Sequence, residues 1–399
     1  MAAVPGSFFR RTLFWAHLCC GVAAGLIILV LSVTGVMLAY EKQLVAAAAR
    51  GNLLTVAPAT AALDADHLAQ IARQAAPDAD RLSLVFDANP LAPVAVSRGR
   101  ETAVLLNPYT GEAIPDASAG TRQFLRKVED WHRWLAGDPR STRANLVDAC
   151  NLLFVFIVLS GSYLWLPAVW RWRTVRSLLW FKGKYLNSKL RDFTWHHVFS
   201  VWMLIPLLLI SVSGVVMSYD WANNLVFAAF GEQAPQRRGP ESPGNGTGAA
   251  RPTESGDATP RASFAALLSI AQSELAPWQR LTLPVLPAGS RVDISAELQS
   301  DETRPPRQTL TLSAIDGSVL KRSPPPGNAA PLQSPGQRAR VWFRFVHTGE
   351  AYGLIGQTLA ALASIAACFL VYTGLALAFR RLILPLWRTR SPPSGTLPT

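Results

Sequence analysis

Two stretches of the chain match position for position: HLCCGVAAGLIILVLSVTGVMLAY at residues 17–40 and HHVFSVWMLIPLLLISVSGVVMSY at residues 196–219. In each stretch a Gly follows the first His by 18 residues and a Tyr follows it by 23. Each is apolar and long enough to cross a bilayer, which takes about 20 helical residues. An ionisable side chain is costly in lipid, so a His repeated at the same depth in two spans indicates a function.

Four apolar segments are predicted to cross the membrane: residues 13–40, 146–168, 196–219 and 354–379. The first is about twice as long as the apolar region of a cleaved signal peptide, so we expect an uncleaved anchor within residues 1–40. The remaining polar regions are two long segments, a short loop and a tail, at residues 41–145, 220–353, 169–195 and 380–399.

The formal net charge of +12 is concentrated in the N-terminus, the short loop and the tail, whereas the two long segments are nearly balanced. Because positively charged flanks stay in the cytoplasm, we expect both termini and the short loop on the cytoplasmic side of the membrane. Both long segments are then exported. This topology accounts for the basic charge, and we expect no nucleic-acid partner. The basic residues concerned are Arg10, Arg11, Arg171, Arg173, Arg176, Lys182, Lys184, Lys189, Arg191, Arg380, Arg381, Arg388 and Arg390.

Each long segment contains the pattern of a small α+β module. The first predicts a helix and then three strands, and a turn rich in Pro and Gly follows; the residues are 63–75, 82–86, 94–97, 102–106 and 107–111. The second repeats the pattern at residues 264–275, 281–285, 292–296, 309–313 and 314–317, after a linker at 232–262 that we expect to be flexible. The predicted fold is an α-helical membrane protein with four transmembrane helices and two exported α+β modules, internally duplicated. Copies in the same orientation imply a pseudo-twofold axis along the membrane normal.

A second histidine precedes the second and fourth spans. His132 lies in Asp130-Trp131-His132-Arg133-Trp134-Leu135, and His347 lies in Phe345-Val346-His347-Thr348-Gly349-Glu350. The spans that follow end in the small pairs Ser160-Gly161 and Thr373-Gly374. The topology therefore predicts a cytoplasmic layer with His17, His196 and His197 and an exported layer with His132 and His347. His67 is expected to be an ordinary surface residue of the first module.

Two imidazoles that face each other can hold a haem iron from opposite sides, and facing helices of a bundle can supply them. The alternative is that these histidines are interfacial polar residues without a ligand. His196 is favoured over His197 because it is in register with His17, although either remains possible. Asp148, the one acid inside a predicted span, is either a charge near a helix N-terminus or a group with a proton or haem-edge role. No Gly-rich dinucleotide motif occurs, so an electron donor would be a quinol or a redox protein.

These motifs resemble the PepSY-associated transmembrane helix family, and the two exported modules resemble PepSY domains. Some members are inner-membrane reductases of iron–siderophore complexes that bind b-type haems through histidines in these spans. The resemblance implies a reductase of ferric siderophores or other ferric chelates with two haems of b type. The alternatives are a non-redox membrane regulator of a protease and an accessory protein of iron uptake. The resemblance implies ligands from His17 and His196, or His197, for a cytoplasmic-side haem and from His132 and His347 for an exported-side haem. The motifs that carry it are residues 17–40, 131–135, 196–219, 347–350, Gly353 and 373–374.

Overall fold

The computed structural model describes residues 5–54, 61–77, 79, 81–99, 101–166, 172–181, 183–235, 262–285, 290–299, 306–323 and 334–385. The chain divides into two compact units. The helical unit comprises Met1–Glu41, Gln123–Ala234 and Pro335–Thr399, and the sheet unit comprises Lys42–Arg122 and Pro235–Ser334. Most of the predicted flexible linker, residues 232–262, lies outside the described residues.

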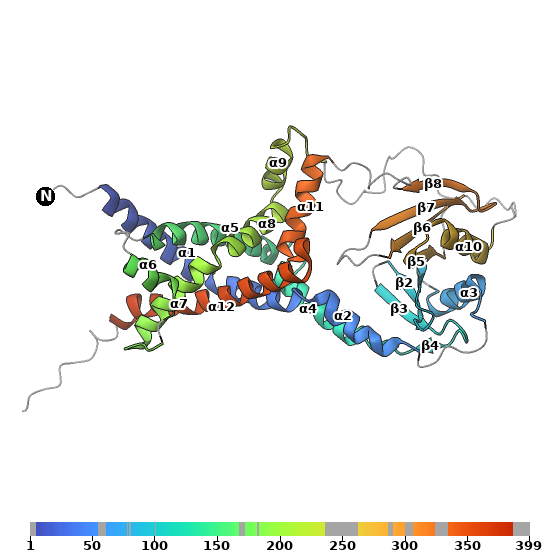
Figure 1. Cartoon of the computed structure of the whole chain (residues 1–399), viewed down its shortest axis with the longest axis horizontal. Helices are drawn as coiled ribbons and strands as arrows, with labels where there is room; N and C mark the ends of the chain where they lie inside the picture. Colours follow the sequence, from blue (N-terminus) through green and yellow to red (C-terminus); the bar gives the residue numbers. More distant parts are fainter. Residues whose placement is uncertain are drawn as a thin grey trace, which may run out of the picture. The chain divides into compact units, whose positions relative to one another are not determined.

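Three long apolar helices of the helical unit are candidate membrane spans: α1 (Pro5–Leu38), α5 (Thr142–Trp165) and α12 (Gly353–Leu382) (Figure 1). They coincide with three of the four predicted spans. The fourth predicted span consists of two helices, α7 (Ser188–Trp202) and α8 (Leu204–Ser218), which are bent by 69° at the break between them. The chain therefore has three candidate spans, or four if the bent pair is one broken span.

The break between α7 and α8 corrects the prediction of one uninterrupted helix over residues 196–219. Pro206 lies in the first turn of α8. Its ring has no N–H to donate and would clash with the carbonyl four residues earlier, at Trp202, if α7 continued. The helix consequently ends at Trp202 and restarts after Met203.

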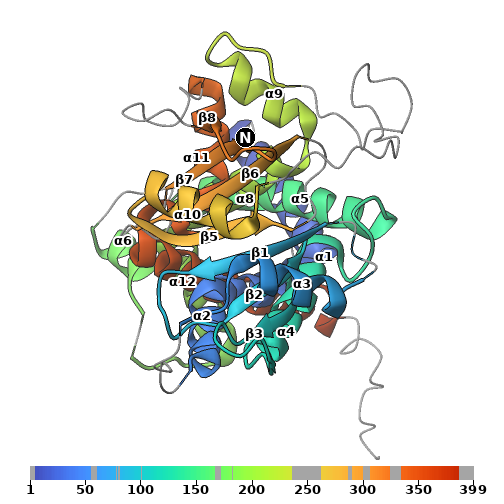
Figure 2. The same cartoon turned by 90° about the vertical axis from the view of Figure 1, so that its right-hand side faces the viewer.

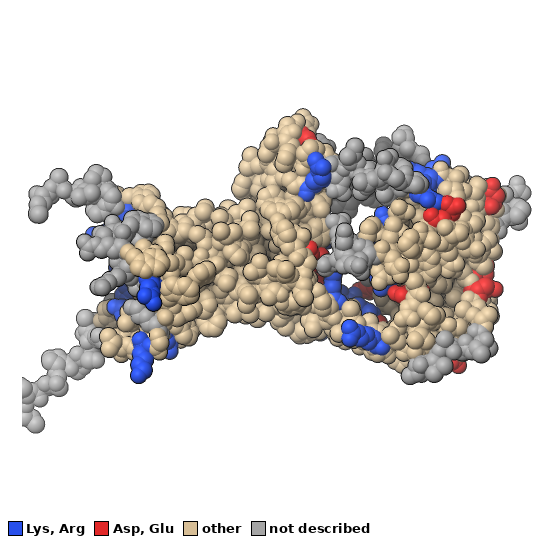
Figure 3. Space-filling model, viewed as in Figure 1, with Lys and Arg blue, Asp and Glu red and all other residues tan. Residues whose placement is uncertain are grey.

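Small residues let these helices approach closely. α1 packs against α12 and α5, α7 packs against α12, and α5 packs against α8. Ala24, Ala363 and Ala367 are buried between the helices. Small side chains are expected there, because helices in a membrane associate by packing their backbones closely together. Over α1, α5, α8 and α12 the visible surface carries no charge in its middle part, and Lys and Arg gather at the end with α6 (Trp172–Leu179) and α7 (Figure 3).

Shorter helices complete the helical unit or join it to the rest of the chain. They are α4 (Ala119–Trp134), α9 (Asp220–Ala228) and α11 (Pro335–His347), with η2 (Glu350–Tyr352) before α12. α2 (Glu41–Ala49) and η1 (Arg50–Asn52) follow α1. α4 carries His132 in its last turn, and α11 ends at His347.

The sheet unit contains one antiparallel sheet of eight strands, in the order β4-β3-β2-β1-β5-β6-β7-β8. Its first half is β1 (Leu82–Asp87), β2 (Val94–Arg98), β3 (Glu101–Leu106) and β4 (Ala113–Ile114), and its second half is β5 (Trp278–Pro284), β6 (Arg291–Leu298), β7 (Arg307–Ser313) and β8 (Val319–Ser323). α3 (Ala65–Ala75) and α10 (Phe264–Glu274) lie on the same face of it (Figure 2).

The two predicted α+β modules therefore do not form separate bodies. β1 pairs with β5, with Leu84 opposite Leu283, so the two halves share a continuous sheet and a common helix layer. Joining the halves removes two edge strands, whose unpaired backbone groups would otherwise need protection. The halves are also tied through their helices, because the Asp66 carboxylate of α3 accepts hydrogen bonds from the backbone N–H groups of Phe264 and Ala265.

Candidate functional site

Four imidazoles of the helical unit are each held by a hydroxyl from another helix. At the end that carries Arg10 and Arg11, His17 Nδ1 lies 2.9 Å from Ser160 Oγ of α5. At the same end His196 Nδ1 lies 2.9 Å from Thr373 Oγ1 of α12. We call His17 and His196 the inner pair.

The other two imidazoles are also each held by a hydroxyl from another helix. Here α4 and α11 carry the histidines, and α1 and α8 carry the hydroxyls. His132 Nδ1, from α4, lies 2.8 Å from Thr34 Oγ1 of α1. His347 Nδ1, from α11, lies 3.1 Å from Ser213 Oγ of α8 and 3.0 Å from the carbonyl of Ile210. We call His132 and His347 the outer pair.

The hydrogen bonds of the hydroxyls indicate which ring nitrogen carries the proton. Thr34 Oγ1 donates to the carbonyl of Val30 at 2.7 Å, and Thr373 Oγ1 donates to that of Phe369 at 2.7 Å. Ser160 and Ser213 donate to carbonyls three residues earlier, at 3.2 and 2.8 Å. A hydroxyl has only one proton, so each of these oxygens can only accept from the imidazole. All four rings consequently carry hydrogen on Nδ1 and keep a lone pair on Nε2.

A glycine directly follows each of these hydroxyls, and at three of them it lies against the imidazole. A Cβ at Gly161 would lie 3.1 Å from His17 Cε1, and one at Gly374 would lie 3.4 Å from His196 Cε1. At Gly35 the corresponding distance to His132 Cε1 is 3.6 Å. The Ser/Thr–Gly pairs at the span ends are thus seats for the histidines of the neighbouring helix, and in each the hydroxyl orients the ring. Of these three glycines, Gly161 is the one where an added Cβ would crowd the imidazole. At Gly374 and Gly35 the distance to the ring is that of an ordinary van der Waals contact, and the closest atom to a Cβ at Gly35 is Ser364 Oγ, at 3.2 Å.

Gly214 does not follow this rule, because the nearest group to its position is the side chain of Asn151. Asn151 Nδ2 donates to the carbonyl of Ser211 at 3.1 Å. The seat of His347 is therefore built from the Ser213 hydroxyl and the Ile210 carbonyl without a contact to glycine.

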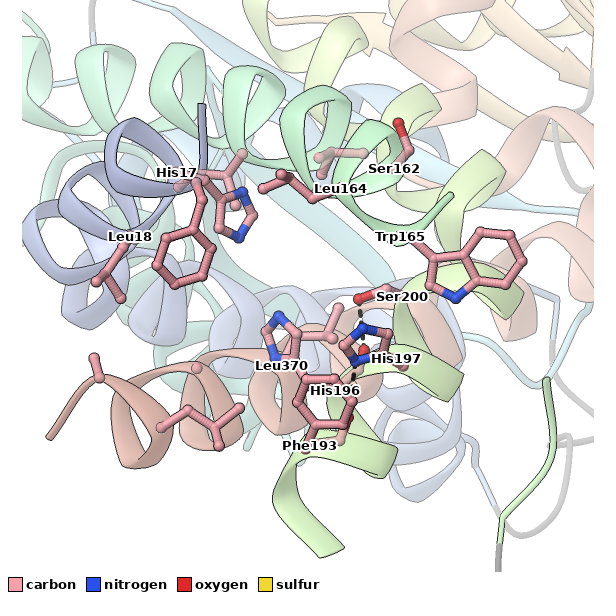
Figure 4. Close-up of a pocket in the computed structure, with 18 of the residues that line it drawn as sticks. His17, Leu18, Ser162, Leu164, Trp165, Phe193, His196, His197, Ser200 and Leu370 are labelled. Carbon is pink, nitrogen blue, oxygen red and sulfur yellow. Dashed lines mark hydrogen bonds between the residues drawn. The ribbon is translucent and has the colours of Figure 1, made fainter. Parts of the chain in front are cut away.

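The inner pair lines a cavity of about 1690 Å³. In Figure 4 the rings of His17 and His196 lie on opposite sides of this space, and His197 lies beside His196. Gly21, whose missing Cβ would meet nothing within 4 Å, also lines the cavity. The cavity walls are mainly apolar, with basic residues at one end: Arg10, Arg11, Lys189, Arg380 and Arg381.

The outer pair has its rings close together, with 6.2 Å between the ring centres and 62° between the ring planes. The guanidinium of Arg133 lies 4.4 Å from the ring centre of Trp134. The ring of Trp134 thus packs against Arg133, the residue before it in α4, whereas the side chain of Trp131 is exposed.

The remaining candidates of the sequence analysis are placed as follows. His197 donates from Nδ1 to the carbonyl of Phe193 in its own helix, at 2.9 Å, and has no hydroxyl seat. His67 is exposed on α3, in the sheet unit. Asp148 lies in α5, close enough to Tyr219 to interact with it electrostatically. Only His17, His132, His196 and His347 share the seated geometry.

The small Ser/Thr–Gly pairs are visible in the sequence, but their role as seats for the histidines was not predicted. The signal was present, because Thr34, Ser160, Ser213 and Thr373 each directly precede the glycine that ends a motif. Among the described residues, no group of three or more His, Cys, Asp and Glu side chains could hold a metal ion.

Comparison with known proteins gives one family. The model of the family described as PepSY-associated TM region matches residues 14–381. The curated proteins yield no match. The matched region includes both histidine pairs and their four hydroxyl seats.

Proposed function

Because the chain belongs to the family of PepSY-associated TM regions, we propose that it is an electron-transfer protein of the bacterial inner membrane that holds two b-type haems. It crosses the membrane four times, with both termini in the cytoplasm. It passes electrons outward and reduces ferric iron bound to a siderophore or another chelator. The observation that carries this proposal is the fourfold seat, which leaves every paired imidazole with a free Nε2.

The inner pair fits a haem by its donors and by its space. His17 and His196 present neutral imidazoles across a mostly apolar cavity of about 1690 Å³. This volume exceeds the roughly 300–1,000 Å³ of ordinary small-molecule sites. The basic residues at one end of the cavity suit the two carboxylates of the macrocycle.

The outer pair fits a haem by its separation. Two bonds between a first-row metal and imidazole, of roughly 2.0–2.1 Å each, together with the half-widths of two rings place the ring centres about 6 Å apart. The ring centres of His132 and His347 lie 6.2 Å apart. At this spacing His132 and His347 would both hold the iron of one haem.

Haem iron held by two imidazoles accepts and donates one electron at a time. The residues of this chain bind and orient it. The hydroxyls of Ser160 and Thr373 hold the inner imidazoles in the tautomer that offers Nε2, and Thr34 and Ser213 do so for the outer imidazoles. A hydrogen bond from the other ring nitrogen also raises the basicity of the ligand and so stabilises the ferric state.

The charge distribution supports the direction of transfer. The basic end of the helical unit carries the inner pair, and basic flanks remain in the cytoplasm. The outer pair and the sheet unit, which we interpret as two fused PepSY modules, are then on the exported side. Reduction at that surface releases iron from hard oxygen chelators, since they hold Fe(II) far less firmly than Fe(III).

The test is the absorption spectrum of the full chain, purified in detergent after expression with haem supplied. We expect a Soret band that shifts when dithionite is added. The band should lose intensity in His17→Ala and in His132→Ala, and should be unchanged in the matched control His67→Ala. A folded protein without a Soret band would refute the proposal and favour the non-redox regulator.

A second assay addresses the substrate. The protein is reduced with dithionite, freed of excess reductant and mixed with ferric chelates, and its reoxidation is followed in the Soret region. Reoxidation by a ferric siderophore is expected. If the reduced haem protein fails to react with every ferric chelate, the reductase assignment is wrong even though haem is bound.

A further inference from the structure

His197 supplies the inner cavity with a hydrogen-bond acceptor that the inner pair does not use. Its Nδ1 bonds to the carbonyl of Phe193 at 2.9 Å, and its ring centre lies 4.1 Å from that of Phe193. A carbonyl only accepts, so the proton of His197 is on Nδ1 and the lone pair is on Nε2. His197 lines the same cavity as His17 and His196 (Figure 4).

Trp165, the last residue of α5, supplies the complementary donor. Among the described residues, its Nε1 is the one buried side-chain nitrogen or oxygen without a hydrogen-bond partner. An indole N–H can only donate, and a donor buried without an acceptor is unfavourable. Trp165 lines the cavity, and in Figure 4 its ring nitrogen is on the side of the indole that faces His197. The lining of the cavity thus includes both an unsatisfied donor and an available acceptor.

The remaining walls favour a lipid-soluble ligand. Leu164, Leu166, Leu178 and Phe193 line the cavity, and Leu166 and Phe193 are exposed on the surface of the helical unit. The volume of about 1690 Å³ leaves room for a second molecule beside a haem held by His17 and His196. His197 itself lies next to the inner pair, with 6.5 Å between its ring centre and that of His196.

We propose that this part of the inner cavity binds the head group of a membrane quinol, with Trp165 Nε1–H donating to a quinol oxygen and His197 Nε2 accepting from a quinol hydroxyl. A hydroxyl group meets both requirements, because it donates and accepts. A haem carboxylate would satisfy Trp165 only, since an ionised carboxylate cannot donate. The apolar walls accommodate the isoprenoid side chain.

The bound quinol is the electron donor if the proposed function holds, so this role of the quinol rests on that function. One quinol gives one quinone, two electrons and two protons. The two electrons reduce two ferric ions of the chelate to ferrous ions, and both protons pass to water at the basic end of the unit. Binding of the head group itself does not depend on haem.

The experiment measures binding of a short-chain ubiquinol to the full chain in detergent by isothermal titration calorimetry, under anaerobic conditions that keep the quinol and any bound haem reduced. Saturable binding to one site is expected. Loss of one hydrogen bond, in Trp165→Phe or in His197→Leu, should raise the Kd about 10-fold. The matched controls are Trp172→Phe, at an exposed tryptophan of α6, and His67→Leu, and both should bind as the wild type does. Thermal melting of each variant shows whether it is folded.

Two outcomes overturn the proposal: no saturable ubiquinol binding by the wild type, or equal Kd values for Trp165→Phe, His197→Leu and the controls. A loss of haem from Trp165→Phe without any ubiquinol binding by the wild type would assign the indole to a haem carboxylate instead. Ubiquinol binding by a chain without a Soret band would support the quinol site while refuting the haem proposal, so the two failures are distinguishable. In the haem-loaded protein, the reduced quinone should also bleach the ferric Soret band anaerobically, and more slowly in both variants.

Discussion

Replacing Thr373 by Val tests whether the hydroxyl seats control the histidines. Thr373 is fully buried, accepts from His196 Nδ1 at 2.9 Å and donates to the Phe369 carbonyl at 2.7 Å. Valine keeps the shape of the side chain but removes one of the two acceptors of His196 and leaves only the carbonyl of Leu370. The loss of one hydrogen bond costs about 0.5–1.5 kcal/mol. Changes in the partner of a metal-bound imidazole typically weaken metal binding roughly 10–100-fold. We expect Thr373→Val to weaken inner-site haem binding by a factor in that range.

The assay adds haemin to haem-free protein and follows the Soret band, and the midpoint potential of the inner haem is measured on the loaded protein. Thr373→Val should raise the potential, because the imidazole becomes a weaker donor to ferric iron. Thr373→Ser should restore both quantities. The matched control is Thr358→Val in the same helix, since Thr358 also donates to a carbonyl four residues earlier but contacts Tyr40 instead of a histidine. Equal haem affinity and equal potential in Thr373→Val and Thr358→Val would refute the role of the seat.

Three further predictions concern Gly161, the cap that Asp66 provides for α10 and the turn that contains Asp316. Gly161→Ala should disturb the Soret band more than Gly374→Ala, because the added Cβ would lie 3.1 Å from the imidazole of His17 but 3.4 Å from that of His196; equal spectra would contradict this. Asp66→Ala should lower the unfolding free energy of the sheet unit by about 0.5–2 kcal/mol, since its carboxylate caps α10, and leave the Soret band unchanged; urea unfolding measures it, and an unchanged midpoint would count against the cap. Hydrogen bonds from the side chain of Ser313 and from the backbone and side chain of Ser318 lower the pKa of Asp316 to about 2. The folded pKa is below the unfolded value of about 3.9, so the stability that Asp316 contributes is present above pH 4 and lost as pH falls towards 2; Asp316→Ala should remove that part of the acid dependence of unfolding, and an identical pH profile for the variant would show that the turn contributes nothing.

Much of the helical unit could be predicted from local patterns. The apolar segments are long and uninterrupted, so α1, α5 and α12 lie where the hydropathy placed them. The family resemblance, which rests on motifs at fixed spacing, is confirmed. The break at Pro206 was equally visible in the sequence, but the register between residues 17–40 and 196–219 favoured one uninterrupted span. The steric effect of Pro206 on the helix therefore outweighs the similarity between the two repeated segments.

The sheet unit shows a different limit. The predicted strands agree with β1 to β3 and β5 to β7 to within a few residues, because alternation of buried and exposed side chains is a local property. The pairing of β1 with β5 joins segments that are about 200 residues apart, and nothing in either strand specifies that partner. The short strands β4 and β8 were not predicted because each follows a turn and has little apolar patterning.

Sequence alone determined which residues belong to the candidate site: five histidines at span ends, placed in two layers by charge and spacing. Tertiary structure alone decided how they are used. It separated four seated imidazoles from His197, and it assigned their protons by contacts between residues 98 to 177 positions apart. The physical reason is that membrane depth follows from the length and polarity of one segment, which any window of sequence contains. The state of an imidazole depends on its hydrogen-bond partner, which only the packing of one helix against another supplies.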